Sequence, residues 1–298
     1  MSSDIHILMT LDVHCYPHTE KEVPLWIQET LQLLNNLCIK ATFFFPAVLV
    51  EKFSLYVQTV LEEGHEIACH GLTHGPEEQY NEMSYERQKA ILCEAKRRIE
   101  EITTREVISF RSPAYKINGD TIKALQENGF RLDSSVNPQR LGILSSDITN
   151  IGWLYSPRKP YHPSFHNPFM AVDGGVSLWE IPQSAFIFPF MSNTGIAFGE
   201  SLMKLFYQML YIESSFRKNP IVYMFHPEDI YPKRNRFNYE FEWQDLFPSR
   251  LKGFAIRKIL FHNKNPEKIS HQIIGLLKIM KESKDIKFLT FREMLDLL

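Results

Sequence analysis

Short β-like runs alternate with helical patterns along almost the whole chain of 298 residues. Such alternation is typical of parallel sheets, because each parallel strand needs a long crossover connection that a helix usually provides. The β-like runs cover residues 5–12, 41–45, 65–70, 107–111, 130–134, 177–182, 221–226 and 286–290. Eight runs in a chain of this length predict an α/β fold, namely an irregular (β/α) barrel of seven to eight parallel strands.

The helical patterns fall between these runs, for example from Pro24 onward, from Ser84 onward and between Gly119 and Gly129. Residues 136–176 show little periodicity and are rich in Pro, Asn, Ser and Gly, which predicts a long surface insertion. We find no tandem repeat and no low-complexity linker. The sequence therefore predicts a single domain over residues 1–298 that carries one long loop insertion.

Composition excludes several classes of function. With 33 basic and 35 acidic residues, the net charge of -2 offers no basic field for nucleic acid. The longest apolar stretch, residues 41–50, contains Pro46 and is far shorter than the roughly 20 residues that span a bilayer. The N-terminus lacks the features of a secretory signal, so we expect a cytoplasmic protein. In that reducing compartment the four cysteines are expected to be buried thiols rather than disulfides.

Ionisable residues gather where the β-like runs end. In (β/α) barrels the catalytic groups lie at the carboxyl ends of the strands, so these residues are the candidates for chemistry. Five of the eight runs end in such residues, namely Asp12 and His14, His70 and His74, Arg111, Asp133, and His226. Glu228 and Asp229, which follow His226, could touch substrate, but we interpret them as solvated turn residues.

His70 and His74 are four residues apart, so both could bind one metal ion if the segment forms a helical turn. Two imidazoles and one further ligand would leave a coordination position open, which is the pattern of a catalytic zinc site. Asp12 could serve as general base there. Taken alone, the two histidines could equally be polar turn residues, and Asp12 could be a solvated turn residue.

Four further segments, together with these strand ends, resemble the polysaccharide deacetylase family, the NodB-homology group of carbohydrate esterases. They are residues 40–46 (KATFFFP), 64–70 (GHEIACH), 110–113 (FRSP) and 288–292 (FLTFR). The similarity extends over nearly the entire chain. It implies a NodB-like barrel and a metal-dependent hydrolase of amide bonds.

The resemblance also implies roles for individual residues. Asp12 would be the general base, His70 and His74 would bind the metal, and His226 would be the general acid that protonates the leaving amine. Arg111 would hold and tune Asp12, and Asp133 would orient and polarise His226. The backbone N–H near Tyr115 would help to stabilise the oxyanion. We also expect Pro113, Tyr115 and Trp179 to contact substrate, although Trp179 could instead be a loop-packing residue.

The first motif departs from the common family pattern. Many members have a second aspartate that binds metal directly after the base, and this chain has Val13 there. Side chains at i and i+2 of a strand share a face, so His14 could reach the metal beside Asp12. We therefore predict a His14, His70 and His74 site for Zn²⁺, with Co²⁺, Ni²⁺ and Fe²⁺ as alternatives. Two other interpretations are that Asp12 itself binds the metal and that the site is poor in metal.

The resulting hypothesis is a hydrolase that removes an N-linked acetyl group from an acetamido sugar or a glycan precursor. One alternative is a hydrolase of a small non-sugar amide on the same scaffold. Another is a catalytically silent glycan-binding protein, which the replaced second aspartate suggests. The sequence leaves the oligomeric state and the exact acyl group open.

Overall fold

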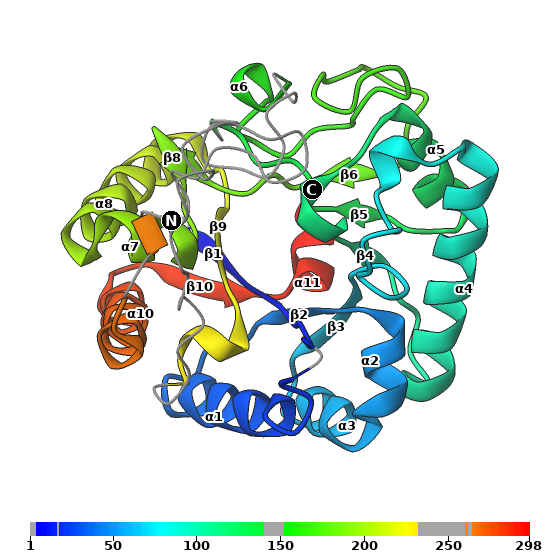
Figure 1. Cartoon of the computed structure of the whole chain (residues 1–298). Coiled ribbons are helices and arrows are strands. Elements are labelled where there is room, and N and C mark those ends of the chain that lie inside the picture. Colours follow the sequence, from blue (N-terminus) through cyan, green and yellow to red (C-terminus); the bar gives the residue numbers. More distant parts are fainter. Residues whose placement is uncertain (1–3, 17, 140–151, 232–259, 262–263) are drawn as a thin grey trace, which may run out of the picture.

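The computed structural model describes residues 4–16, 18–139, 152–231, 260–261 and 264–298, and its strands form a curled parallel sheet (Figure 1). Among the described residues, eight strands make up this sheet: β1 (Ile5–Asp12), β2 (Thr42–Phe45), β3 (Glu66–Cys69), β4 (Ser109–Phe110), β5 (Leu132–Asp133), β6 (Trp179–Glu180), β9 (Ile221–Phe225) and β10 (Ile286–Leu289). This arrangement confirms the predicted irregular (β/α) barrel of seven to eight parallel strands.

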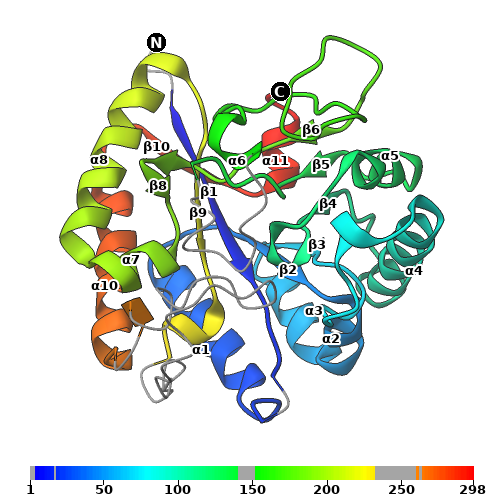
Figure 2. The same ribbon diagram turned by 45° about the horizontal axis from the view of Figure 1, so that its top comes forward.

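Helices surround the sheet (Figures 1 and 2). They are α1 (Val23–Asn36), α2 (Ala47–Lys52), α3 (Ser54–Glu62), α4 (Tyr85–Thr103), α5 (Gly119–Glu127), α6 (Gly152–Tyr155), α7 (Ser192–Phe198), α8 (Glu200–Arg217), α10 (Pro266–Glu282) and α11 (Phe291–Leu295). A short antiparallel hairpin of β7 (Ala185–Phe186) and β8 (Phe188–Pro189) precedes α7. No helix within the described ranges combines the length and apolarity needed to cross a membrane.

Strand β1 organises the sheet. Residues 7–11 pair with β9 along one edge, whereas the other edge is shared between two strands. Its first half, residues 5–8, pairs with β10, and residues 10–12 pair with β2. Because β1 pairs with strands along both of its edges, it lies inside the sheet rather than at a margin, and it is buried over nearly its whole length. Asp12 is the last residue of this strand.

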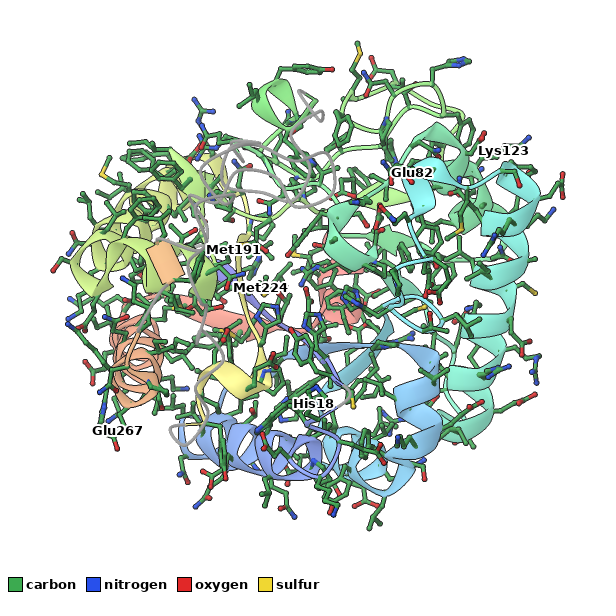
Figure 3. The ribbon with its side chains drawn as sticks, in the orientation of Figure 1. His18, Glu82, Lys123, Met191, Met224 and Glu267 are labelled. Atoms are coloured by element: carbon green, nitrogen blue, oxygen red, sulfur yellow. The ribbon has the colours of Figure 1, made fainter. Side chains whose placement is uncertain are left out.

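The gap between β6 and β9 is bridged without a continuous ladder of backbone hydrogen bonds. Gln183 Nε2 donates to the Val222 carbonyl oxygen at 2.7 Å, and Val222 N–H donates to Ser184 Oγ at 2.9 Å. A single parallel bridge joins Met191 to Met224, and both are marked in Figure 3. Side chains therefore complete the barrel where the strands are too short to pair.

The core has two parts. Alternate residues of the strands point outward and pack against the helices, and those between them point inward. The inward cluster is capped at one end by α11 and consists of Leu8, Phe44, Ala68, Ile108, Leu132, Ile181, Val222, Leu289, Phe291 and Met294. Thr10 and Asp12 continue the inward face of β1 beyond Leu8. The barrel interior is thus apolar in its middle and polar at the carboxyl ends of the strands.

The sequence located most elements but missed several. Helix α2, the β7–β8 hairpin and helix α7 were not predicted, because these segments are too short to show a clear period. Part of the predicted insertion, residues 140–151, lies outside the described residues. The prediction of four buried thiols was wrong, because only Cys69 is buried, whereas Cys15 is partly buried and Cys38 and Cys93 are exposed.

Candidate functional site

Three histidines from two strand ends meet at the carboxyl end of the barrel. His14 follows β1, His70 follows β3, and His74 lies four residues further along the same loop. One nitrogen from each ring can be chosen so that all three lie within 4.8 Å of one another. The ring centroid of His74 lies 4.5 Å from that of His14 and 4.9 Å from that of His70. The structure therefore brings together the three residues predicted as a metal site.

The protonation states of these rings are those that binding of a metal ion requires. His70 Nδ1 donates to the Arg111 carbonyl oxygen at 2.8 Å, which leaves the lone pair on Nε2. Burial lowers the pKa of His70 to about 3 and also lowers the pKa of His74, so both rings are neutral near pH 7. His74 Nε2 is buried and has no hydrogen-bond partner within the part of the chain that the structure describes. Neutral, converging imidazoles are the ligands that Zn²⁺ accepts, so these residues fit a divalent metal.

Asp12 lies beside this cluster and forms a buried ion pair with Arg111. Arg111 Nη1 donates to Asp12 Oδ1 at 2.8 Å, and the two side chains are 0% and 4% exposed. Burial alone would raise the pKa of Asp12, but the positive charge of Arg111, with His70 and His226 nearby, outweighs it and lowers that pKa. Asp12 is therefore an ionised carboxylate at neutral pH, as a general base must be.

Arg111 crosses the barrel interior to reach Asp12. Its Nη1 also donates to Thr10 Oγ1 at 3.0 Å, while Nε and Nη2 donate to the carbonyl and hydroxyl oxygens of Ser134 at 3.1 and 2.9 Å. The guanidinium carbon lies 4.2 Å from the centre of the Phe44 ring, on top of the apolar interior. One side chain thus ties β1, β4 and the end of β5 together beneath the site.

His226, the last residue before a short turn at the end of β9, is oriented by Asp229. Asp229 Oδ2 accepts from His226 Nδ1 at 3.1 Å, from the His226 backbone N–H at 3.1 Å and from Ser192 Oγ at 2.7 Å. The His226 ring lies 4.7 Å from the His14 ring. With Nδ1 directed at Asp229, proton transfer to a substrate has to take place at Nε2.

This contact corrects two predictions. We expected Asp133 to orient His226, but the carboxylate on His226 Nδ1 is that of Asp229. We also expected Glu228 and Asp229 to be solvated, yet both are buried. The sequence did contain a signal for the contact between Asp229 and His226. When a proline begins a turn and an acidic residue follows two positions later, that acidic side chain often caps the residue before the proline.

Asp133 instead belongs to a buried pair of carboxyl groups. Burial raises the pKa of both Asp133 and Glu180, and the negative charge of Asp133 raises that of Glu180 further, so the pair retains a proton. Ser135 Oγ donates to Asp133 Oδ1 and accepts from the Ser112 backbone N–H at 2.8 Å. Asp133 therefore supports the turn that follows Arg111.

That turn carries Pro113 and Tyr115, which were predicted to contact substrate. Both are buried, and Ala114 and Tyr115 have positive φ angles of 54° and 62°. The backbone N–H of Tyr115 donates to the Ser112 carbonyl oxygen at 3.0 Å, so in this conformation it cannot stabilise an oxyanion. The turn lies next to the site through Arg111, and its contact with substrate stays a prediction.

Trp179 lies away from the histidine cluster in its described contacts. Its ring contacts the His162 ring with centroids 3.8 Å apart and packs against the apolar cluster inside the barrel. These are packing contacts, so the position of Trp179 favours the alternative role in loop packing over substrate contact.

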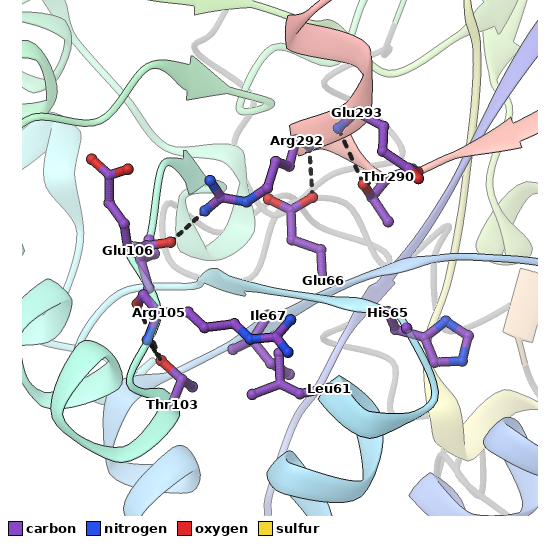
Figure 4. A pocket seen from close by; sticks show the side chains of 12 residues that line it. Leu61, His65, Glu66, Ile67, Thr103, Arg105, Glu106, Thr290, Arg292 and Glu293 are labelled. Carbon is purple, nitrogen blue, oxygen red and sulfur yellow. Dashed lines mark hydrogen bonds between the residues drawn. The ribbon is translucent and has the colours of Figure 1, made fainter.

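A cavity of about 180 Å³ opens at the other end of the barrel (Figure 4). It is lined by residues at the beginnings of β3 and β4 and around the start of α11, including Arg105 and Arg292. The predicted site residues lie at the opposite, carboxyl ends of the strands. The histidine cluster therefore remains the candidate active site.

Replacing Asp229 by asparagine is expected to lower kcat roughly 10- to 100-fold, a part of the 10²- to 10⁴-fold that a positioned proton donor contributes. The matched variant Asp133→Asn is expected to change stability more than kcat, because its contacts are structural. Steady-state kinetics on both variants measure the difference. A larger loss of kcat in Asp133→Asn than in Asp229→Asn would restore the original assignment.

The fold and the site define a class of (β/α)-barrel proteins that gather imidazoles and a buried carboxylate at the carboxyl ends of the strands. Residues 3–132 match the family model described as Polysaccharide deacetylase.

Two curated relatives cover part of the same segment. A peptidoglycan deacetylase-like protein of Gibberella zeae is 33% identical over 109 residues, which make up 36% of this chain and 31% of that protein. The peptidoglycan deacetylase of Helicobacter pylori is 26% identical over 110 residues, 37% of this chain and 36% of that protein. The match spans about a third of the length of these relatives.

Solved structures extend the similarity of fold to the whole chain. A Mycobacterium smegmatis protein described provisionally as a polysaccharide deacetylase superposes with a TM-score of 0.62 at 15% identity, covering 100% of this chain and 91% of its own. Puue allantoinase superposes with a TM-score of 0.60 at 14% identity, covering 98% of this chain and 89% of its own. At such low identities these likenesses concern the fold alone.

Proposed function

We propose that this protein is a divalent-metal-dependent hydrolase that removes an N-acetyl group from an acetamido sugar or a glycan precursor. The observation that carries the proposal is the convergence of His14, His70 and His74 within 4.8 Å, beside the ionised Asp12. The family match over residues 3–132 supports deacetylation as the reaction. Three imidazole ligands suit Zn²⁺, and Co²⁺, Ni²⁺ or Fe²⁺ could also occupy such a site.

Hydrolysis of an amide bond requires an activated water molecule, stabilisation of the negative charge on the carbonyl oxygen and a proton for the leaving nitrogen. When bound by the three histidines, the metal supplies Lewis acidity to the site. Asp12, held by Arg111, accepts a proton from the attacking water. His226 donates a proton from Nε2 to the leaving amine, with its ring fixed by Asp229. The products are acetate and the free amino sugar, and the protons balance between the two residues.

Metal removal tests this proposal. Protein prepared without added metal is expected to contain about one zinc per chain, as three histidines and an open position define one site. Dialysis against a chelator should abolish acetate release from acetamido sugars, and added Zn²⁺ or Co²⁺ should restore it. Elemental analysis and an enzymatic acetate assay measure the two quantities. Activity that survives complete removal of metal would contradict the mechanism.

The same experiment separates the alternatives. Turnover of small amides but not of acetamido sugars would favour the non-sugar hydrolase. Retained glycan binding without any turnover, even with metal supplied, would favour the silent binding protein. We also propose a cytoplasmic location and hence a substrate made inside the cell, which recovery of the protein from the cell-surface fraction would overturn.

A further inference from the structure

The loop between His70 and His74 has an unusual backbone. Gly71 has a φ angle of 83° and His74 has a φ angle of 60°, and both values lie in the left-handed region. Glycine adopts this region readily, but a side chain such as that of histidine disfavours it. Contacts from elsewhere must therefore hold His74 in the conformation that turns its ring toward His14 and His70.

Glu78 provides these contacts. Its buried carboxylate accepts hydrogen bonds from three consecutive backbone N–H groups, those of Leu72 at 2.6 Å, Thr73 at 2.7 Å and His74 at 2.8 Å. It also accepts from Thr73 Oγ1 at 2.9 Å and from Tyr80 Oη at 2.7 Å. Successive N–H groups that surround one anion form a nest, and bonds to an ionised acceptor are stronger than neutral ones.

The fit between the carboxylate and the loop is tight. A Cβ atom added to Gly71 would lie 2.3 Å from Glu78 Oε1 and 3.2 Å from Pro113 Cγ, so only glycine fits here. On the other side, Tyr80 is fully buried and packs edge to face against Phe110, with ring centroids 5.5 Å apart. The Glu78 carboxylate is thus held between the histidine loop and the outer core of the barrel.

Glu78 is separate from the candidate ligands. It does not belong to the group of His14, His70 and His74 whose nitrogens converge. Both of its oxygens already accept hydrogen bonds, two on Oε1 and three on Oε2. A carboxylate engaged in this way is suited to fixing a backbone rather than to binding metal or moving a proton.

We propose that Glu78 is a positioning residue that sets the metal affinity of the site by holding the backbone of Leu72, Thr73 and His74. The inference rests on the proposed function, because it requires that the histidines bind metal. Glu78 acts through His74, in the same way as residues in other metal sites that form hydrogen bonds to the ligands and fix their orientation.

The chain offers a matched control in Glu77. This neighbouring glutamate is exposed, and its carboxylate accepts a hydrogen bond from the Thr73 side chain, Oγ1, at 3.1 Å. Glu78→Gln keeps the shape of the side chain but replaces one acceptor oxygen by a donor and removes the charge. Glu77→Gln makes the same chemical change next to it. Glu78→Ala serves as the complete deletion if it folds.

The test measures Zn²⁺ affinity of the metal-free proteins by competition with a chromophoric chelator, and the visible spectrum of the Co²⁺-loaded proteins. Glu78→Gln is expected to bind Zn²⁺ about 10- to 100-fold more weakly than wild type and to show altered Co²⁺ bands. Glu77→Gln should match wild type in both. The melting temperature of each metal-free protein shows whether the variant is folded. If Glu78 had only a structural role, Glu78→Gln would lower the melting temperature and leave the Zn²⁺ affinity unchanged.

Equal Zn²⁺ affinity and identical Co²⁺ spectra in wild type and folded Glu78→Gln would overturn this inference and leave the proposed function standing. A wild-type protein that binds neither Zn²⁺ nor Co²⁺ would overturn the proposed function, and this inference with it.

Discussion

Replacing Asp12 by asparagine is expected to lower kcat about 10²- to 10⁴-fold while the protein keeps its bound metal. The physical reason is that asparagine preserves the oxygen that Arg111 contacts at 2.8 Å but cannot accept a proton from water. Elemental analysis and acetate-release kinetics on the same preparation measure both effects. Asp12 is thereby tested as a base and as a ligand in one experiment.

His14→Ala provides the complementary result. Loss of one of three converging imidazoles is expected to remove the metal and the activity together. His18→Ala is the control, because His18 is an exposed histidine in the same loop (Figure 3). The opposite pattern, with metal lost in Asp12→Asn and kept in His14→Ala, would make Asp12 the third ligand.

Replacing Arg111 by methionine is expected to lower the free energy of unfolding by about 3–5 kcal/mol, the usual effect of leaving a buried charge without its partner. Arg111 is fully buried, and its positive charge is what holds the pKa of the buried Asp12 carboxyl below its ordinary value. Without it, Asp12 must either stay ionised in an apolar environment or take up a proton. Urea denaturation followed by circular dichroism measures the change.

The double variant Arg111→Met, Asp12→Asn is the control for this prediction. It removes both charges, so part of the lost stability should return although activity does not. If the double variant is no more stable than Arg111→Met, then Arg111 stabilises the barrel through its hydrogen bonds to Thr10 and Ser134 rather than by neutralising Asp12.

Much of the fold followed from local patterns. The run 5–12 coincides with β1, and the helical pattern from Ser84 onward corresponds to α4, because strand and helix periods are properties of consecutive residues. The prediction at 107–111 was less accurate, since only Ser109–Phe110 form a strand. Strand ends depend on which neighbour pairs with them, and neighbours distant in sequence leave no local signal.

For the candidate site, too, the sequence predicted some features and not others. Asp12, His14, His70, His74, Arg111 and His226 were all predicted, since each lies at or just beyond a strand end where a barrel places its functional groups. Their convergence required the structure. Glu78 was not singled out by any pattern, because its partners are backbone N–H groups and a sequence does not show where those point.

The sequence alone determined the class of fold and the residue types available for chemistry, because apolar periodicity and short motifs are encoded in neighbouring residues. The tertiary structure alone decided which groups act on one another: Arg111 on Asp12 across the barrel, Asp229 rather than Asp133 on His226, and Glu78 on the histidine loop. Hydrogen bonds and ion pairs act over about 3 Å. Which carboxylate comes within that distance depends on the curvature of the sheet and the path of each turn, and these are set by the packing of the whole chain.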